Sequence, residues 1–148
     1  MAVKISTAAN LISKLAITGL KIRDLDEIKE LMQISDMPCL MPHPRNFFSN
    51  FVTVPQNSTN AYANETYTLH YRLYFKAITG SVKFFGPYAD LVAMTEKILN
   101  KFISSDSLSG AIYVKPRIEF LGGVEDHAGN IYHGGDIAFD IMELYEVA

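Results

Sequence analysis

The stretch TYTLHYRLYFKA, residues 66–77, alternates apolar and polar side chains with a period of two. Such alternation is typical of a β-strand with one buried and one solvated face. The apolar row holds Tyr67, Leu69, Tyr71, Leu73, Phe75 and Ala77, and the polar row holds Thr66, Thr68, His70, Arg72 and Lys76. The sequence therefore predicts a long strand here, which Gly80 ends.

Shorter strands are predicted before this one. Residues 20–23 alternate like a short strand, and residues 47–54 are apolar and β-branched. Residues 36–44 contain three prolines, which push the preceding residues out of the α region, so this stretch should be extended. Residues 55–65 are rich in Asn, Ser and Thr and predict a loop.

Two more strands are predicted towards the C-terminus. Residues 112–120 alternate, and Pro116 lacks an amide hydrogen, which predicts an edge strand or a bulge. Residues 122–135 are expected to form a glycine-rich connection. Residues 136–141 alternate again, and the change of parity at Met142 and Leu144 predicts a bulge or a strand end.

Two helices complete the expected fold. Ser6 is a suitable N-cap for a helix that Gly19 would stop, and Asp24 or Asp26 can cap a brief turn through Leu31. A second helix should begin at Pro87, with an apolar stripe of Tyr88, Leu91, Val92, Thr95, Leu99 and Phe102. No βαβ alternation appears, so we expect one α+β domain over residues 1–148. Its sheet should be mostly antiparallel, with two helices packed on one face.

Composition narrows the functional class. Hydrophobic residues make up 49% and charged residues 20% of 148 residues, as in ordinary globular domains. No apolar run approaches the ~20 residues that cross a bilayer, and no secretory signal is visible, so we expect no membrane partner and synthesis in the cytoplasm. A single cysteine fits a reducing compartment.

The net charge of −3 hides an asymmetry. Residues 122–148 contain no Lys or Arg but six acidic side chains, Glu125, Asp126, Asp136, Asp140, Glu143 and Glu146. The basic residues all lie before this segment, without the clustered basic face of a nucleic-acid-binding domain. We therefore expect no specific nucleic-acid binding, and we expect the acidic end to pair with the basic body, within the chain or between copies.

The charged strands supply the candidate interface residues. A hairpin would place Asp136 and Asp140 on the same side of the sheet as Lys115 and Arg117. In an oligomer the acidic end of one subunit would also face the next, including its Arg72 and Lys76. The same acidity would alternatively line a lumen through which DNA passes without binding.

Candidate chemical groups are few. The histidines His43, His70, His127 and His133 are candidate metal ligands, with Asp126 and Asp136 near the last two, but zinc sites usually recruit cysteines or tightly spaced histidines. Cys39 is a candidate nucleophile with His43 as base, but its apolar neighbours favour a buried, inert thiol. No nucleotide-binding or hydrolase motif is present. We expect no cofactor, no metal site and no enzymatic activity.

Three stretches carry a resemblance to a known family. They are KIRDLDEI at residues 21–28 followed by DMPCLMPHP at 36–44, the strand YTLHYRL at 67–73 with a proline-started helix after it, and LGGVEDHAGNIYHGGDI at 121–137. In this order they resemble the tail-terminator, or tail-completion, proteins of long-tailed bacteriophages. These are small α/β subunits that close the head-proximal end of the tail tube.

The resemblance implies a structural virion protein without catalytic residues, made in the host cytoplasm. It implies a homo-oligomeric ring, a hexamer, that binds the last ring of tail tube protein and a head-completion protein. The segment from Pro42 to Glu65 would project and dock on the tube. Alternatives are another neck or tube protein of the head–tail interface, a small enzyme or metal-binding module that uses the histidine-containing C-terminal loop, and a nucleic-acid-binding module.

Overall fold

A computed structural model describes residues 4–29, 32–43, 46–52, 62–78, 88–105, 107–110 and 112–146. Its helices and strands, in chain order, are α1 (Ile5–Ser13), β1 (Lys21–Ile22), the 3-10 helices η1 (Leu25–Glu27) and η2 (Ile34–Asp36), β2 (Cys39–Pro42), β3 (Phe48–Val52), β4 (Tyr62–Ala77), α2 (Tyr88–Ser104), β5 (Ser107–Ser109), β6 (Ile112–Glu125) and β7 (Ile131–Glu146).

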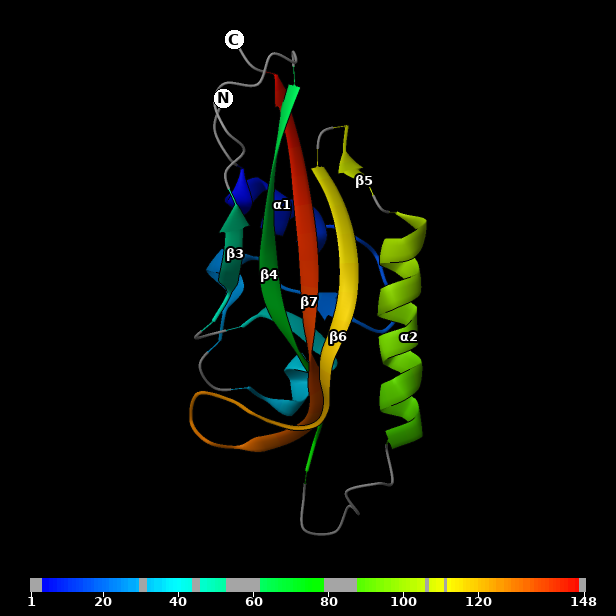
Figure 1. Cartoon of the computed structure of the whole chain (residues 1–148). Helices are drawn as coiled ribbons and strands as arrows, with labels where there is room; N and C mark the ends of the chain where they lie inside the picture. Colours follow the sequence, from blue (N-terminus) through cyan, green and yellow to red (C-terminus); the bar gives the residue numbers. More distant parts are fainter. Residues whose placement is uncertain are drawn as a thin grey trace.

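One sheet of seven strands organises the structure (Figure 1). The strand order is β1-β2-β4-β7-β6-β5, and β3 also pairs with β4. Among the described strands, β1 and β2 are the one parallel pair, and the other pairs are antiparallel. The predicted α+β class with a mostly antiparallel sheet is confirmed.

The strand predicted over residues 66–77 is confirmed, and it is longer than predicted. β4 begins at Tyr62, so the expectation of a loop to residue 65 is wrong by four residues. The reason is β7, which pairs with β4 as far as Tyr62 opposite Glu146 and extends the ladder into polar sequence. Residues 44–45 and 53–61 of the expected docking segment lie outside the described residues, whereas β2 and β3 hold parts of it in the sheet.

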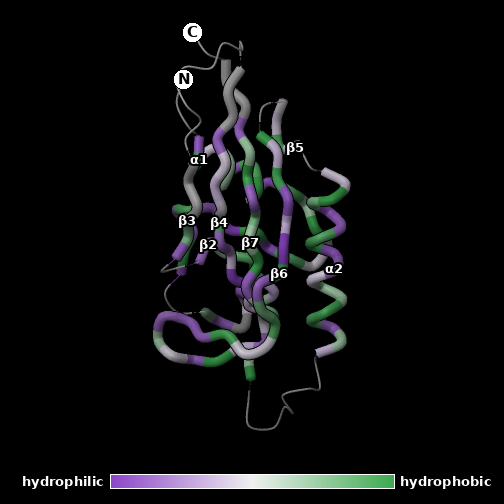
Figure 2. Tube along the Cα trace, in the orientation of Figure 1, coloured by the Kyte–Doolittle hydropathy of each residue, from purple (hydrophilic) through white to green (hydrophobic). Residues whose placement is uncertain are grey.

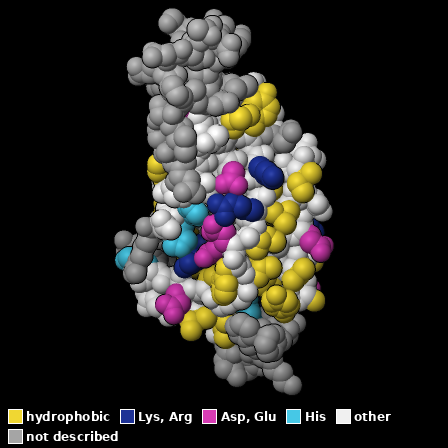
Figure 3. Space-filling model, viewed as in Figure 1, with side chains coloured by type: hydrophobic (Ala, Val, Ile, Leu, Met, Phe, Trp, Pro, Cys, Tyr) yellow, Lys and Arg dark blue, Asp and Glu magenta, His cyan; other side chains and the backbone are white. Residues whose placement is uncertain are grey.

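Both helices pack on the same face of the sheet, which we call the inner face. Hydrophilic and hydrophobic residues alternate along α2 (Figure 2). Its buried residues are Leu91, Met94, Thr95, Ile98 and Phe102. The predicted stripe is thus partly wrong, because Tyr88 is 39% exposed while Met94 and Ile98 face the sheet. The opposite, outer face of the sheet carries charged side chains at its centre (Figure 3).

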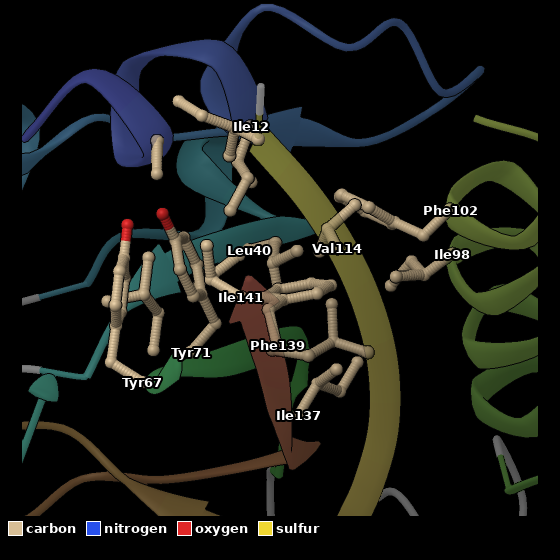
Figure 4. Close-up of a cluster of buried hydrophobic side chains, with 14 of the residues drawn as sticks. Ile12, Leu40, Tyr67, Tyr71, Ile98, Phe102, Val114, Ile137, Phe139 and Ile141 are labelled. Atoms are coloured by element: carbon tan, nitrogen blue, oxygen red, sulfur yellow. The ribbon is translucent and has the colours of Figure 1, made fainter. Parts of the chain in front are cut away.

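Aromatic and aliphatic side chains fill the space between helices and sheet (Figure 4). The ring of Phe139 on β7 lies 4.4 Å from that of Phe102 on α2 and 5.1 Å from that of Tyr71 on β4, measured between centroids. Ile12 brings α1 into the same cluster. Each fully buried aromatic or aliphatic side chain of this kind stabilises the fold by about 1.5–3 kcal/mol.

The start and end predicted for the first helix are wrong. Lys4 is the N-cap of α1, so Ser6 lies inside the first turn. The helix ends at Ser13, well before Gly19, which has a φ of +80° in the turn that joins Ile17 to Leu20. Glycine suits this backbone conformation, but it belongs to the turn and not to the helix end.

The prediction of a capped turn after residue 23 is confirmed in part. The Asp24 carboxylate accepts the backbone N–H of Leu25, and the Glu27 side chain accepts the N–H of Asp24. The turn is a 3-10 helix that ends at Glu27, short of Leu31. A second 3-10 helix takes in Asp36, so the extended stretch is limited to Cys39–Pro42.

The expected glycine-rich connection over residues 122–135 is wrong. Gly122, Gly123, Gly134 and Gly135 lie inside β6 and β7, with Gly122 opposite Gly134, and only residues 126–130, which include Gly129, join the strands. A Cβ on Gly134 would overlap the carbonyl oxygen of Leu73 and lie 2.8 Å from Val124 Cγ2. These glycines therefore allow three strand backbones to approach closely where β4 changes register.

The bulge expected near Met142 is also absent from the described pairing. β7 pairs in unbroken register through Met142 with Thr66 and with Tyr113, and the register shifts lie at Tyr74/Lys76 and Ile118/Phe120. The parity of the sequence is misleading because the inner-face position after Ile141 is a buried carboxylate, Glu143.

The edge strand and bulge predicted from Pro116 are both present. The short β5 pairs with β6 only at Ile112 and Tyr113, and a register shift follows at residues 118–120. Within the described residues, β6 beyond Tyr113 pairs on one side only.

Gly134→Ala should destabilise the protein by about 1–3 kcal/mol, because the new methyl group must displace backbone atoms of β4. Gly110→Ala is the matched control, since a Cβ there meets nothing within 4 Å, and it should change stability by less than about 0.5 kcal/mol. Urea unfolding measures both. Equal stabilities of the two variants would contradict the close approach at Gly134.

Candidate functional site on the outer face of the sheet

Charged side chains lie close together across the middle of the outer face (Figure 3), and hydrogen bonds join them. Asp140 lies opposite Thr68 of β4 and opposite Lys115 of β6. Thr68 Oγ1 donates to Asp140 Oδ1 over 2.8 Å, and Arg117 Nε donates to Asp140 Oδ2 over 3.0 Å. A carboxylate on the central strand β7 is therefore held from both neighbouring strands.

The network continues from Arg117 to β3. Arg117 Nη1 donates to Glu119 Oε1 over 2.8 Å, and Glu119 Oε2 lies 3.2 Å from His70 Nδ1. His70 Nε2 lies 2.6 Å from Ser49 Oγ. Ala138 of β7 lies opposite His70, and its small side chain leaves room for His70 to reach across to β6.

Arg72 forms a separate ion pair on the same face. Its Nε and Nη2 donate to the two carboxylate oxygens of Asp136, over 2.7 Å and 3.1 Å. Nη1 donates to the backbone carbonyl of Glu125 over 3.0 Å. The planar guanidinium thus fixes β4 to β7 and to the tip of the β6–β7 hairpin.

Four of the six candidate interface residues are brought together within one chain. The hairpin places Asp136 and Asp140 on the face that carries Lys115 and Arg117, as predicted. Arg117 pairs with Asp140, and Arg72 with Asp136. Lys115 is exposed opposite Asp140, whereas Lys76 is exposed opposite His133, beyond the register shift of β4.

The four histidines occupy different surroundings. His70 belongs to the network, and His127 is exposed in the hairpin tip. His133 is buried on β7, which lowers the pKa of its ring. Burial and then the charge of Arg72 lower the pKa of His43, which borders a polar cavity of about 330 Å³ between Arg72 and residues 125–129. Among the described residues, no three His, Cys, Asp or Glu side chains are grouped as metal ligands.

Sequence analysis missed the role of Asp126. One oxygen accepts the backbone N–H groups of Ala128 and Asn130, and the other accepts the hydroxyl of Tyr132 over 2.9 Å and the N–H of Met32 over 3.4 Å. Burial would raise the pKa of this carboxyl, but the hydrogen bonds outweigh it and lower the pKa. The turn sequence Asp-His-Ala-Gly-Asn was the available signal, because Asp accepts hydrogen bonds from the backbone that follows it.

Asp126 accepts hydrogen bonds from Tyr132 and Met32, two members of a second, smaller apolar cluster. Its buried members are Met32, Cys39, Met41, Tyr74, Val124 and Tyr132. The Cys39 thiol is fully buried here, and burial raises its pKa, as expected for an unreactive cysteine. Asp126 therefore fixes the hairpin tip to the folded body, although residues 127–131 of the tip are exposed.

Two buried carboxylates were also missed. Glu65 and Glu143 are direct cross-strand partners, each 5% exposed, on the inner face. Both oxygens of Glu143 accept the backbone N–H of Lys4 over 3.0 Å, at the start of α1. A carboxylate is stabilised at a helix N-terminus, so this contact helps to fix α1 to the sheet.

Asp126→Asn should destabilise the protein by about 1–3 kcal/mol at pH 7, because an amide nitrogen cannot accept from Tyr132 and Met32. Since the folded-state pKa is lowered, the carboxylate stabilises the fold above the unfolded pKa of about 4, and this contribution is lost as pH falls through the folded value. The difference from wild type should therefore shrink at acidic pH.

Urea unfolding at several pH values measures this effect. Glu96→Gln, at an exposed position of α2, is the control and should leave stability almost unchanged. A loss for Asp126→Asn that is the same at every pH would show that the charge of Asp126 does not hold the hairpin.

Comparison with known proteins gives no family for this chain. The sequence matches no family model and no curated protein. Of the two α-helices in the described residues, neither combines the length and the apolar character that a membrane span requires.

Proposed function

We propose that this chain is a structural subunit that closes the head-proximal end of the tail tube of a long-tailed bacteriophage. The sequence resemblance suggests the role, and the open edge of β6 is the structural observation that supports it. In this proposal copies form a ring, a hexamer, which binds the tail tube protein on one side and a head-completion protein on the other. The role requires no cofactor and no catalysis, and it places the protein in the virion after synthesis in the host cytoplasm.

The open edge begins where β5 ends. β6 continues for twelve residues beyond Tyr113, up to Glu125, and within the described residues no strand pairs with its outer edge there. Unpaired strand edges present backbone donors and acceptors to any other chain, so proteins usually shorten, charge or cover them. α2 runs alongside β6 (Figure 1), so we assign the contact with a neighbouring subunit to the backbone edge at the exposed residues 117–120.

Apolar side chains are exposed on both faces of this edge. Ile118 is 42% exposed opposite Ile137, on the inner face, and Phe120 is 47% exposed opposite Asp136, on the outer face. Hydrophobic side chains gather beside the charged network over β6 (Figure 3). Ile103 near the end of α2 is 66% exposed and borders an apolar groove of about 380 Å³ that also includes Tyr113 and Pro116. Several large apolar side chains exposed along one strand edge favour a protein–protein contact.

The charged network is paired within one chain. Arg72, Arg117, Asp136 and Asp140 already have partners in their own chain, so their charges are largely neutralised before any contact between copies. Under this proposal the β6 edge carries most of the subunit contact, and Lys76 and Lys115 remain for charged contacts at its rim. Alternatively, the acidic residues of the outer face line a lumen through which DNA passes without binding.

Light scattering on the purified protein tests the ring. We expect a single species of about six times the 16.5 kDa chain mass. Ile118→Lys should reduce this mass towards that of one chain, because a charge would be buried at each contact. Ile131→Lys is the control, since Ile131 is similarly exposed, at 49%, but lies at the start of β7 beside the hairpin tip.

Two outcomes would count against the proposal. A wild-type protein that stays a single chain at every concentration, with or without tail tube protein, would contradict the ring. A ring that survives Ile118→Lys would place the contact elsewhere on the subunit. Another neck or tube protein of the same interface remains the alternative, and co-purification with head-completion protein or with tube protein alone distinguishes the two roles.

A further inference from the structure

Ser49, His70 and Glu119 come together from three strands that are far apart in the sequence. They lie on β3, β4 and β6, and their side chains follow one another across the outer face. The two contacts are 2.6 Å between Ser49 Oγ and His70 Nε2, and 3.2 Å between His70 Nδ1 and Glu119 Oε2. Serine, imidazole and carboxylate in this order are the arrangement that activates a serine hydroxyl.

The neighbouring groups determine which nitrogen of His70 carries the proton. An ionised carboxylate only accepts hydrogen bonds, so His70 donates from Nδ1–H to Glu119. Nε2 then keeps its lone pair and accepts the hydrogen bond from the Ser49 hydroxyl. In this tautomer the imidazole is a base placed directly on the serine proton.

Backbone and side-chain contacts hold the three residues in place. The backbone N–H of His70 donates to the carbonyl of Phe47 over 2.7 Å, which fixes β3 beside β4 next to Ser49. Arg117 holds the other oxygen of Glu119. The His70 side chain is only 12% exposed, whereas Ser49 is half-buried on the outer face, which neither α1 nor α2 covers among the described residues. The hydroxyl is therefore supported from within, and Ser49 as a residue is partly exposed.

We propose that Ser49 is an activated nucleophile that accepts an acyl group from an activated carboxylic ester. Ser49 Oγ bonds to the carbonyl carbon while His70 Nε2 takes the hydroxyl proton, and the ester C–O bond then breaks as that proton passes to the departing oxygen. The products are acyl-Ser49 and the free alcohol or phenol. This chemistry goes beyond the capping role and does not depend on it.

The reaction should stop at the acyl adduct. The three side chains activate a nucleophile but do not themselves stabilise the oxyanion of the tetrahedral intermediate. In hydrolases a single hydrogen-bond donor to this oxyanion raises kcat by a factor of roughly 10²–10³. Slow release makes Ser49 a site of stoichiometric covalent modification. Glu119 acts through His70 and is a positioning residue.

The test treats the purified full-length protein with p-nitrophenyl acetate and maps acetylated residues by mass spectrometry. Ser104 is an internal control, because it is an exposed serine whose hydroxyl donates to the Lys101 carbonyl and has no base beside it in the described structure. We expect acetylation of Ser49 to be at least about 100-fold faster than that of Ser104. His70→Asn should remove this advantage, and Ser49→Ala should remove the adduct.

A second readout isolates the role of Glu119. The ¹⁵N chemical shifts of His70 should report a proton on Nδ1 in wild type, and Glu119→Gln should change that tautomer and slow acetylation together. Equal acetylation of Ser49 and Ser104 in the wild-type protein would overturn the proposal, whether or not any variant folds. Fast acetylation that His70→Asn leaves unchanged, with circular dichroism like that of wild type, would also overturn it.

Discussion

β4 and β7 lie side by side from Tyr62 opposite Glu146 to Ala77 opposite Tyr132, and the other contacts of the structure depend on this pairing. The inner face of the pair supplies the residues on which both helices pack. Its outer face supplies Thr68, His70 and Arg72 opposite Asp140, Ala138 and Asp136. If β7 paired with β4 one residue out of register, the charged side chains of β7 would lie on the inner face and be buried. The register of this strand pair therefore positions the hydrophobic core and the charged network together.

The alternation of residues 66–77 was enough to predict β4, because a strand with one buried and one solvated face has apolar and polar residues at alternate positions. The glycines at 122–135 led to the wrong prediction of a connection, because their role depends on tertiary contacts. Glycine is common in turns, but Gly134 is required here by the approach of the Leu73 backbone, a tertiary contact that no local pattern encodes. Glu143 explains the wrong prediction of a bulge near Met142, because a buried carboxylate at an inner-face position interrupts the apolar alternation.

The candidate site was predictable only as a charge pattern. The segregation of acidic residues after residue 122 and the hairpin geometry predicted that Asp136 and Asp140 would face Lys115 and Arg117. Which atoms pair was not predictable, since Arg72 reaches Asp136 from the strand on the other side of β7. Ser49, His70 and Glu119 were invisible as a group, because the register shifts that bring β3 and β6 into line arise only in the folded sheet.

Charges on this face serve first to join strands of one chain, and this distinguishes the face from the β6 edge. Arg72 and Asp136 are about a fifth to a quarter exposed, at 19% and 24%, and form two parallel hydrogen bonds. Such a pair stabilises more than an exposed ion pair, whose median value is about 0–1 kcal/mol. If the pair belongs to a single chain, its energy is independent of contact between copies.

The coupling free energy between Arg72 and Asp136 tests this claim most directly. A double-mutant cycle with Arg72→Ala, Asp136→Ala and the double variant yields the coupling from urea unfolding. The cycle is measured at two protein concentrations that differ by about 100-fold. The account predicts a coupling of roughly 0.5–3 kcal/mol that is the same at both concentrations. A coupling that disappears on dilution would contradict it and place the pair between subunits.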